Sequence, residues 1–255
     1  MTIDPLLLEQ FDRCLRAADA ADPWGELLAA GFLDLCRPES EGGAGVGIDG
    51  LFGLAVAAAR LRPALPVVQT IVARRHEPDA LAVADIERFL VDRGCADVAR
   101  PLAALLAAGS MVGLMEALLD MTVDYARVRE QFGGPIARFQ AVQHQIAVMA
   151  EHVFAARIAT EAAFAGWRRP PRDALVAIAK SRATRAARVV TATAHAVHGA
   201  IGISGEHALG GLAARLRALG MAHGGATYWD ERLGAAVLDD DAPAIEIVVG
   251  LQRST

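Results

Sequence analysis

Residues 125–144, with the sequence YARVREQFGGPIARFQAVQH, interrupt two long apolar helical patterns and so fix where this chain must turn. Before the interruption, apolar residues recur every three or four positions and share one helix face: Met111, Leu114, Leu118, Met121, Tyr125 and Val128. The same spacing resumes after it at Phe139, Val142, Ile146, Met149 and Val153. A helix cannot run through residues 133–135, Gly-Gly-Pro, because Pro135 lacks an amide hydrogen and disfavours helical backbone at Gly134. The pattern predicts a helical hairpin whose second helix opens near Phe139.

Polar side chains cluster near the predicted tip of this hairpin. They are Arg127, Arg129, Gln131, Arg138 and Gln140. Three guanidinium groups and two amides at one turn favour an anionic ligand.

The stretch closely resembles the hairpin that opens the C-terminal helical domain of acyl-CoA dehydrogenases. The matching residues are Tyr125, Arg129, Gln131, Phe132, Gly133, Pro135, Ile136, Phe139, Gln140, Gln143 and His144. In that family the arginine and the Gln-Phe pair contact FAD that a neighbouring subunit mainly holds. The resemblance therefore implies FAD contacts from Arg129, Gln131, Phe132, Gly133 and Gln140. Alone, Arg129 would be interpreted as a solvated cation at a helix end, but its matching neighbours favour the cofactor role.

Composition sets the class of protein and excludes several functions. Apolar residues make up 54% of the 255-residue chain and aromatic residues only 5%, so helices rich in alanine and leucine are expected. A net charge of −5 without a basic run gives no support for nucleic-acid binding. The longest apolar run, residues 102–115, is short for a membrane span, and no signal peptide is evident. Three scattered cysteines offer no metal-ligand spacing, and we expect a cytoplasmic location.

Two segments before the hairpin resemble the N-terminal part of the same family. Residues 32–45 read as a hydrophobic run, Pro-Glu and then Gly-Gly-x-Gly, and residues 62–66 read Arg-Pro-Ala-Leu-Pro. Helices are expected near residues 6–15, from residue 22 to Gly31, and at residues 51–61. Residues 79–100 allow either a helix or one or two short strands.

Fewer than about thirty residues separate the two helical parts, too few for a sheet of five or six strands. Full-length acyl-CoA dehydrogenases place a β-rich middle domain there, which cradles the flavin ring. We therefore expect a mainly α chain with N-terminal and C-terminal helical bundles and the middle β-domain largely deleted. The predicted division is an N-terminal helical domain (1–78), a remnant linker (79–100), a four-helix-bundle domain (101–238) and a tail (239–255).

After the hairpin, a long alanine-rich helix is expected from Asp173 to about His198, with Lys180, Arg182, Arg185 and Arg188 on a mostly solvated face. Residues 198–209 then resemble the family's glycine-rich loop, which meets the ADP portion of the flavin across the subunit boundary. That resemblance implies cofactor contacts from Gly199 and Gly202, although Ala196 and Ala200 replace the usual glutamine and second glycine. Closely spaced glycines let a backbone approach phosphate, and a plain helix-connecting turn is the alternative. Helices are expected from Leu209 to Met221 and again up to about Leu238, before a tail in which residues 245–249 could dock.

No catalytic base is evident. Acyl-CoA dehydrogenation needs a carboxylate to remove the α-proton. The family keeps its glutamate at one of two places, which here correspond to Gly224 and to Ala103 or Ala104. Glu116, Asp120 and Asp124 are spaced by four and are interpreted as a solvated helix edge, and His223 as a structural residue. We therefore assign no catalytic and no metal-binding residue.

Together these features predict a subunit of a heteromeric, FAD-dependent acyl-CoA dehydrogenase. The resemblance extends to an actinobacterial steroid-degrading branch, in which two unlike chains form α₂β₂ heterotetramers. A larger partner would supply the β-domain, the base and most of the site for acyl-CoA. The branch implies a steroid-derived CoA ester as a candidate substrate. The alternative is a non-catalytic helical scaffold or regulatory protein that has lost flavin binding.

Overall fold

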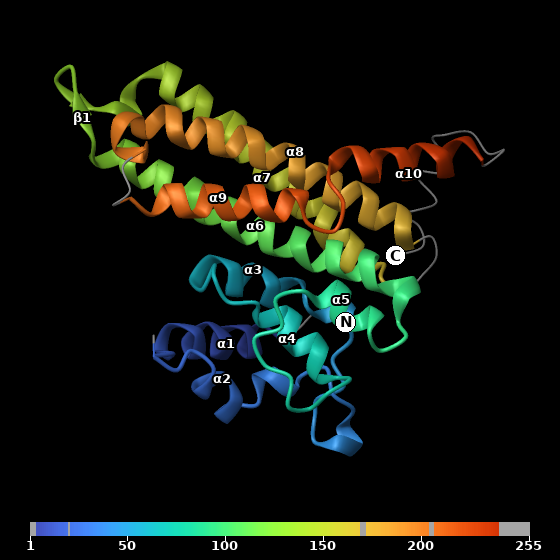
Figure 1. The fold of residues 1–255 in the computed structure, drawn as a ribbon. Coiled ribbons are helices and arrows are strands. Elements are labelled where there is room, and N and C mark those ends of the chain that lie inside the picture. Colours follow the sequence, from blue (N-terminus) through green and yellow to red (C-terminus); the bar gives the residue numbers. More distant parts are fainter. Residues whose placement is uncertain (1–3, 20, 169–171, 204–206, 240–255) are drawn as a thin grey trace.

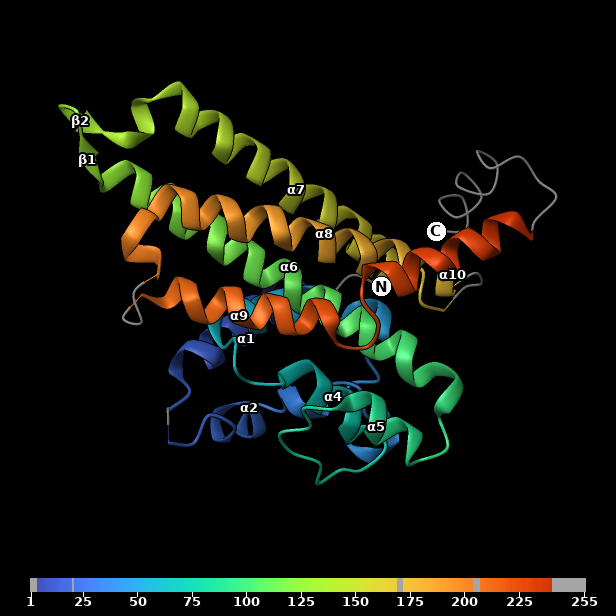
Figure 2. The same cartoon turned by 45° about the horizontal axis from the view of Figure 1, so that its top comes forward.

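The computed structural model describes residues 4–19, 21–168, 172–203 and 207–239, and the regular secondary structure of these ranges is almost entirely helical (Figures 1 and 2). The N-terminal helices are α1 (Pro5–Ala17), α2 (Gly25–Ala29), α3 (Phe52–Leu61), α4 (Val67–Arg74) and α5 (Ile86–Val91). They form a layer beneath the long helices α6 (Ala96–Val128), α7 (Gln140–Ala165), α8 (Arg172–His198), α9 (Ala208–Met221) and α10 (Ala226–Leu238). Short 3-10 turns lie at η1 (Phe32–Asp34), η2 (Glu39–Glu41), η3 (Ile48–Gly50), η4 (Ile136–Arg138) and η5 (Gly199–Ile203).

The N-terminal helices begin and end at the residues expected from the sequence. The Asp4 side chain accepts a hydrogen bond from the Leu6 amide at 2.9 Å, and Pro5 occupies the first helical position of α1. Gly31 follows α2 with φ of 75°, a left-handed conformation that terminates the helix at little steric cost.

Residues 79–100 contain helix and no strand, with non-helical connections at residues 79–85 and 92–95. Asp85 caps α5 through a hydrogen bond from the Arg88 amide at 3.1 Å, and α6 already begins at Ala96. Only two two-residue strands occur in the described ranges, β1 (Glu130–Gln131) and β2 (Gly134–Pro135). The prediction of two helical parts without a middle β-domain between them is confirmed.

Helix α6 is the central element, and the layers meet along it. It packs against α3 on one side and against α7, α8 and α9 on the other. Its length and apolarity would suffice to cross a membrane, but 78% of its most apolar window is buried inside the protein, as in the core helix of a soluble domain. Gly113 allows the close approach to α3, since a β-carbon there would lie 2.3 Å from the Val56 carbonyl oxygen.

Helix α8 contains the single lysine of the sequence, and the structure corrects its expected place. Lys180 is fully buried, not on a solvated face. Its Nζ donates hydrogen bonds of 3.0 Å to the carbonyl oxygens of Gly220 and Gly224, at and just beyond the C-terminal end of α9. Burial lowers the pKa of Lys180 to about 8, while the helix end favours the charged form. Arg185 and Arg188, by contrast, are exposed as expected.

Candidate functional site

The hairpin tip protrudes from one end of the bundle as a tight turn (Figure 1). Strands β1 and β2 pair antiparallel, with Glu130 opposite Pro135 and Gln131 opposite Gly134. Phe132 and Gly133 form the turn with φ of 50° and 84°, as a two-residue type I′ connection requires. Below the turn, the Ile136 amide donates to the Arg129 carbonyl oxygen at 2.8 Å. The predicted break at Gly-Gly-Pro is confirmed, and a short β-hairpin makes the connection.

The side chains predicted to contact FAD lie together on this tip and face solvent. Arg129, Gln131 and Gln140 are exposed, and Phe132 is 89% exposed. The Phe132 ring meets Phe139 edge-on, with centroids 6.0 Å apart. Arg138 is also exposed and donates to the Gly133 carbonyl oxygen at 3.1 Å. An exposed phenylalanine in the left-handed region combines steric strain with an apolar surface, and both are typical of a contact with another molecule.

The glycine-rich segment after α8 lies at the same end of the bundle as the hairpin (Figure 2). The ring of Tyr125, one turn before Arg129, stacks on the ring of His198, the last residue of α8, at 4.3 Å. Its hydroxyl donates to the His198 carbonyl oxygen at 3.4 Å. Tyr125 thus ties the two parts of the predicted site together, although their sequences are far apart.

The two glycines predicted as cofactor contacts have different environments. Gly199 is exposed, has φ of 62°, and faces open space where a β-carbon would stand. Gly202 is buried, and a β-carbon there would lie 3.0 Å from the His198 β-carbon. Gly199 therefore leaves its backbone open to a ligand, whereas Gly202 serves packing. The end of the glycine-rich loop, residues 204–206, lies outside the described residues.

His198 is buried at this junction. Its Nδ1 lies 2.8 Å from the Ala194 carbonyl oxygen, and its Nε2 is buried without a partner in the described chain. Burial lowers the pKa of His198, and the neighbouring His207 and His195 would add repulsion to a proton there. His198 is therefore a neutral ring that supports Tyr125.

The positions where a catalytic glutamate was sought hold no carboxylate. Ala103 and Ala104 are buried in the core of α6, and Gly224 lies in the turn before α10. Glu116 was expected on a solvated helix edge, and the structure corrects this. Its side chain is only 15% exposed and pairs with Arg60 at 3.0 Å and with Arg157. Because both of its oxygens are engaged, Glu116 is a structural link that joins α6 to α3 and α7. Across the described ranges no group of three or more His, Cys, Asp or Glu residues could hold a metal ion.

An ion-paired cluster that the sequence did not indicate lies next to Gly224. Glu87 on α5 bridges Arg100, at 2.8 Å from one carboxylate oxygen, and the His223 Nδ1, at 2.8 Å from the other. Burial alone would raise the pKa of Glu87, but hydrogen bonds from His223 and Arg100 outweigh it and hold that pKa below its ordinary value. An ionised, doubly paired carboxylate is a structural link between α5 and the turn before α10. Its partners are 13 and 136 residues away in sequence, which is why spacing could not reveal it.

The family model of the acyl-CoA dehydrogenase C-terminal domain matches residues 92–229, which include the hairpin and the helices around it. The chain belongs to the acyl-CoA dehydrogenase family. Among curated relatives, the acyl-CoA dehydrogenase IpdE2 of Mycolicibacterium smegmatis is 38% identical over 116 residues, which cover 46% of this chain and 35% of that protein. The 3-sulfinopropanoyl-CoA desulfinase of Paraburkholderia xenovorans is 41% identical over 96 residues, which cover 38% of this chain and 25% of that protein. The matches thus span about a third or less of these relatives' length.

Solved structures extend the likeness over nearly the whole chain. A chain of the ChsE4-ChsE5 complex from Mycobacterium tuberculosis superposes with a TM-score of 0.74 at 21% identity, covering 94% of this chain and 93% of that one. A chain of the Tcur3481-Tcur3483 steroid acyl-CoA dehydrogenase gives a TM-score of 0.76 at 18% identity, covering 92% and 97%. At these identities the comparison shows the fold: a mainly helical acyl-CoA dehydrogenase chain without the middle β-domain.

Proposed function

We propose that this chain is one subunit of a heteromeric acyl-CoA dehydrogenase and that its hairpin tip completes an FAD site held mainly by a larger partner subunit. The observation that carries the proposal is the tip itself. Arg129, Gln131 and Phe132 project from one end of the bundle in a strained turn, and no described part of the chain covers them. A site that faces outward in this way is suited to a ligand held on another chain.

The residues of the hairpin tip and of the glycine-rich segment fit a flavin dinucleotide. Arg129 supplies a cation for a phosphate or carbonyl oxygen, Phe132 an apolar ring, and Gln131 and Gln140 amide groups. Gly133 and Gly199 have open space at the β-carbon position, so a large ligand could approach both backbones closely. When bound, FAD accepts the hydride in α,β-desaturation of a thioester. This chain's own residues would position the cofactor and shield it from water.

We assign no catalytic residue to this chain, so the partner would supply the base, the β-domain and most of the acyl-CoA site. The solved relatives favour this arrangement, since one is a two-component complex and another a steroid acyl-CoA dehydrogenase named for two chains. By analogy with these relatives we propose a hetero-oligomer and a steroid-derived CoA ester as the substrate class. The resemblance in sequence favours an α₂β₂ assembly, and the three scattered cysteines favour a cytoplasmic location.

The decisive experiment is co-purification with a larger acyl-CoA dehydrogenase chain from the same organism, reading subunit stoichiometry and flavin absorbance together. We expect a yellow complex containing equal amounts of the two chains. Arg129→Ala is expected to lower flavin occupancy of the complex, because it removes the cation at the tip.

Arg88→Ala is the matched control. Arg88 lies on α5, far from the hairpin in sequence, is also exposed, and pairs with Asp92 at 3.9 Å. Equal flavin content in both variants would refute the cofactor role of Arg129. A colourless homo-oligomer without affinity for any such partner would instead favour a helical scaffold that has lost flavin binding.

A further inference from the structure

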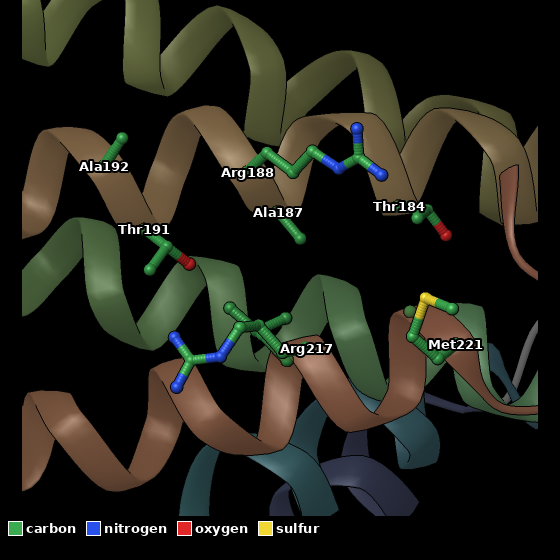
Figure 3. A pocket seen from close by; sticks show the side chains of 9 residues that line it. Thr184, Ala187, Arg188, Thr191, Ala192, Arg217 and Met221 are labelled. Carbon is green, nitrogen blue, oxygen red and sulfur yellow. The ribbon is translucent and has the colours of Figure 1, made fainter.

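A surface groove runs between α8 and α9 (Figure 3). Its volume is about 440 Å³, within the range of sites that enclose a ligand or a short chain segment. The lining residues are Thr184, Ala187, Arg188, Thr191, Ala192, Leu216, Arg217, Gly220 and Met221. The floor is apolar, and the two arginines stand one on each helix. Met221, at the end of α9, is 72% exposed, so an apolar side chain is left uncovered at one end of the groove.

The two arginines at this groove have no counter-ion within the described part of the chain. Arg188 and Arg217 are both exposed, and neither makes an ion pair with any residue in the described ranges. By contrast, Arg185, one turn earlier on α8, makes an ion pair with Asp230. Two unpaired cations beside an apolar floor select an occupant that is apolar on one face and carries a carboxylate on the other.

The chain itself contains a segment with that chemistry, beyond the last described residue. Residues 245–251 read Ile-Glu-Ile-Val-Val-Gly-Leu. In an extended conformation, alternate residues share a face, which here would hold Ile245, Ile247, Val249 and Leu251. Glu246 falls on the opposite face, and β-branched residues favour the extended conformation. Three consecutive aspartates, residues 239–241, add negative charge just before the segment.

The length of the intervening chain allows the segment to reach the groove. Helix α10 starts at Ala226, five residues after Met221, and its 13 residues give a length of about 20 Å. It leads away from the end of α9 (Figure 1). Residues 239–244 can span at most about 20 Å when extended, so they can just return the chain to the level of Met221. Residues 245–249 would then extend over about 16 Å, enough to cover the groove between Met221 and Ala192.

We propose that residues 245–251 of this chain bind in the groove between α8 and α9, with Glu246 placed to pair with Arg188 or Arg217. The apolar face would cover Met221 and Ala192, the lining residues whose apolar side chains are exposed. The contact is intramolecular and does not depend on flavin or on a partner subunit, so its test is independent of the proposed function.

The test uses cysteine cross-linking in the full chain. The double variant Met221→Cys/Ile247→Cys places one thiol at the end of the groove and one in the segment. The control Ile158→Cys/Ile247→Cys places the first thiol on the outer face of α7, where Ile158 is similarly exposed, at 69%. After mild oxidation, the monomer fraction from size exclusion is digested, and each cross-linked peptide is quantified by mass spectrometry. Peptide mapping separates these links from any formed by Cys14, Cys36 and Cys95.

We expect the Met221→Cys link to form roughly tenfold more than the control link, since docking raises the local concentration of the second thiol. Adding Arg188→Ser and Arg217→Ser is expected to remove most of that excess. Adding Arg13→Ser and Arg16→Ser on α1, also exposed, is expected to leave it unchanged. Equal yields for the two double variants would overturn the proposal. A link found only in a dimer fraction would also overturn it, because the segment would then come from a second copy.

Discussion

Replacing Lys180 with methionine is expected to change how the free energy of unfolding depends on pH. In the folded protein the pKa of this ammonium group is about 8, because it is buried, whereas its ordinary value is 10.5. Between these two pH values the unfolded chain binds a proton that the folded chain has released. The free energy of unfolding therefore rises with pH across this window, by up to about 3 kcal/mol for this group. Below pH 8 this stabilisation is lost. Lys180 is then protonated in both the folded and the unfolded protein, and burial of its charge lowers the free energy of unfolding.

At neutral pH two effects oppose each other in the Lys180→Met variant. The variant removes the buried charge, but it leaves the carbonyl oxygens of Gly220 and Gly224 without their donor, at a cost of about 1–3 kcal/mol. We therefore expect wild type and variant to differ little near pH 7. Above pH 10 the wild type is expected to be the more stable by about 1–3 kcal/mol, because only the hydrogen-bond loss remains there.

Urea unfolding followed by circular dichroism at pH 7.5, 9 and 10.5 measures this difference. Subtracting the variant from the wild type cancels the titration of the tyrosines and cysteines, which both proteins share. Lys180 is the only lysine, so no other side-chain amine contributes. If the difference in the free energy of unfolding between wild type and variant stays constant from pH 7.5 to 10.5, the pKa of Lys180 is not lowered. The inference that burial disfavours its charged form would then be refuted.

Variants at three further positions test the packing of α6 and the hairpin. Gly113→Ala is expected to lower the free energy of unfolding by about 1–3 kcal/mol, since its β-carbon would overlap the Val56 carbonyl oxygen, and thermal unfolding would detect this. Tyr125→Leu is expected to cost about 1 kcal/mol through loss of the ring stack on His198, and Tyr125→Phe much less; equal losses in urea unfolding would contradict the stacking. Phe132→Ala is expected to leave the melting temperature of the isolated chain unchanged or slightly raised, because the ring is 89% exposed in a strained turn.

The sequence predicted the elements whose boundaries are set by local chemistry. Gly-Gly-Pro at residues 133–135 excludes a continuous helix whatever surrounds it, and the hairpin is where the spacing placed it. Gly31 and Asp4 likewise mark helix ends through their own backbone or side chain. Val128 was expected on the apolar face of α6, yet it is exposed, because the helix extends beyond its neighbours at that end.

The sequence did not predict features that depend on contacts between distant segments. Lys180 was assigned to solvent from its charge, although Val176, Lys180, Ala187 and Val190 form a stripe of helical spacing that is buried throughout. That spacing indicated burial of Lys180, whereas its charge wrongly indicated exposure. The interlayer pairing of Glu116 and the stack of Tyr125 on His198 have no comparable local signal, since each joins helices that meet only in the folded chain.

The burial of Lys180 has a practical consequence for following the protein in solution. A protease that cuts only after lysine has a single site in this chain, in the middle of the interior face of α8. Cleavage there would require that helix to open, and would divide the chain into residues 1–180 and 181–255. The extent of cleavage at Lys180 therefore measures how often the bundle core opens. An amine-reactive label at Lys180 would report the same opening, apart from its reaction with the amino terminus.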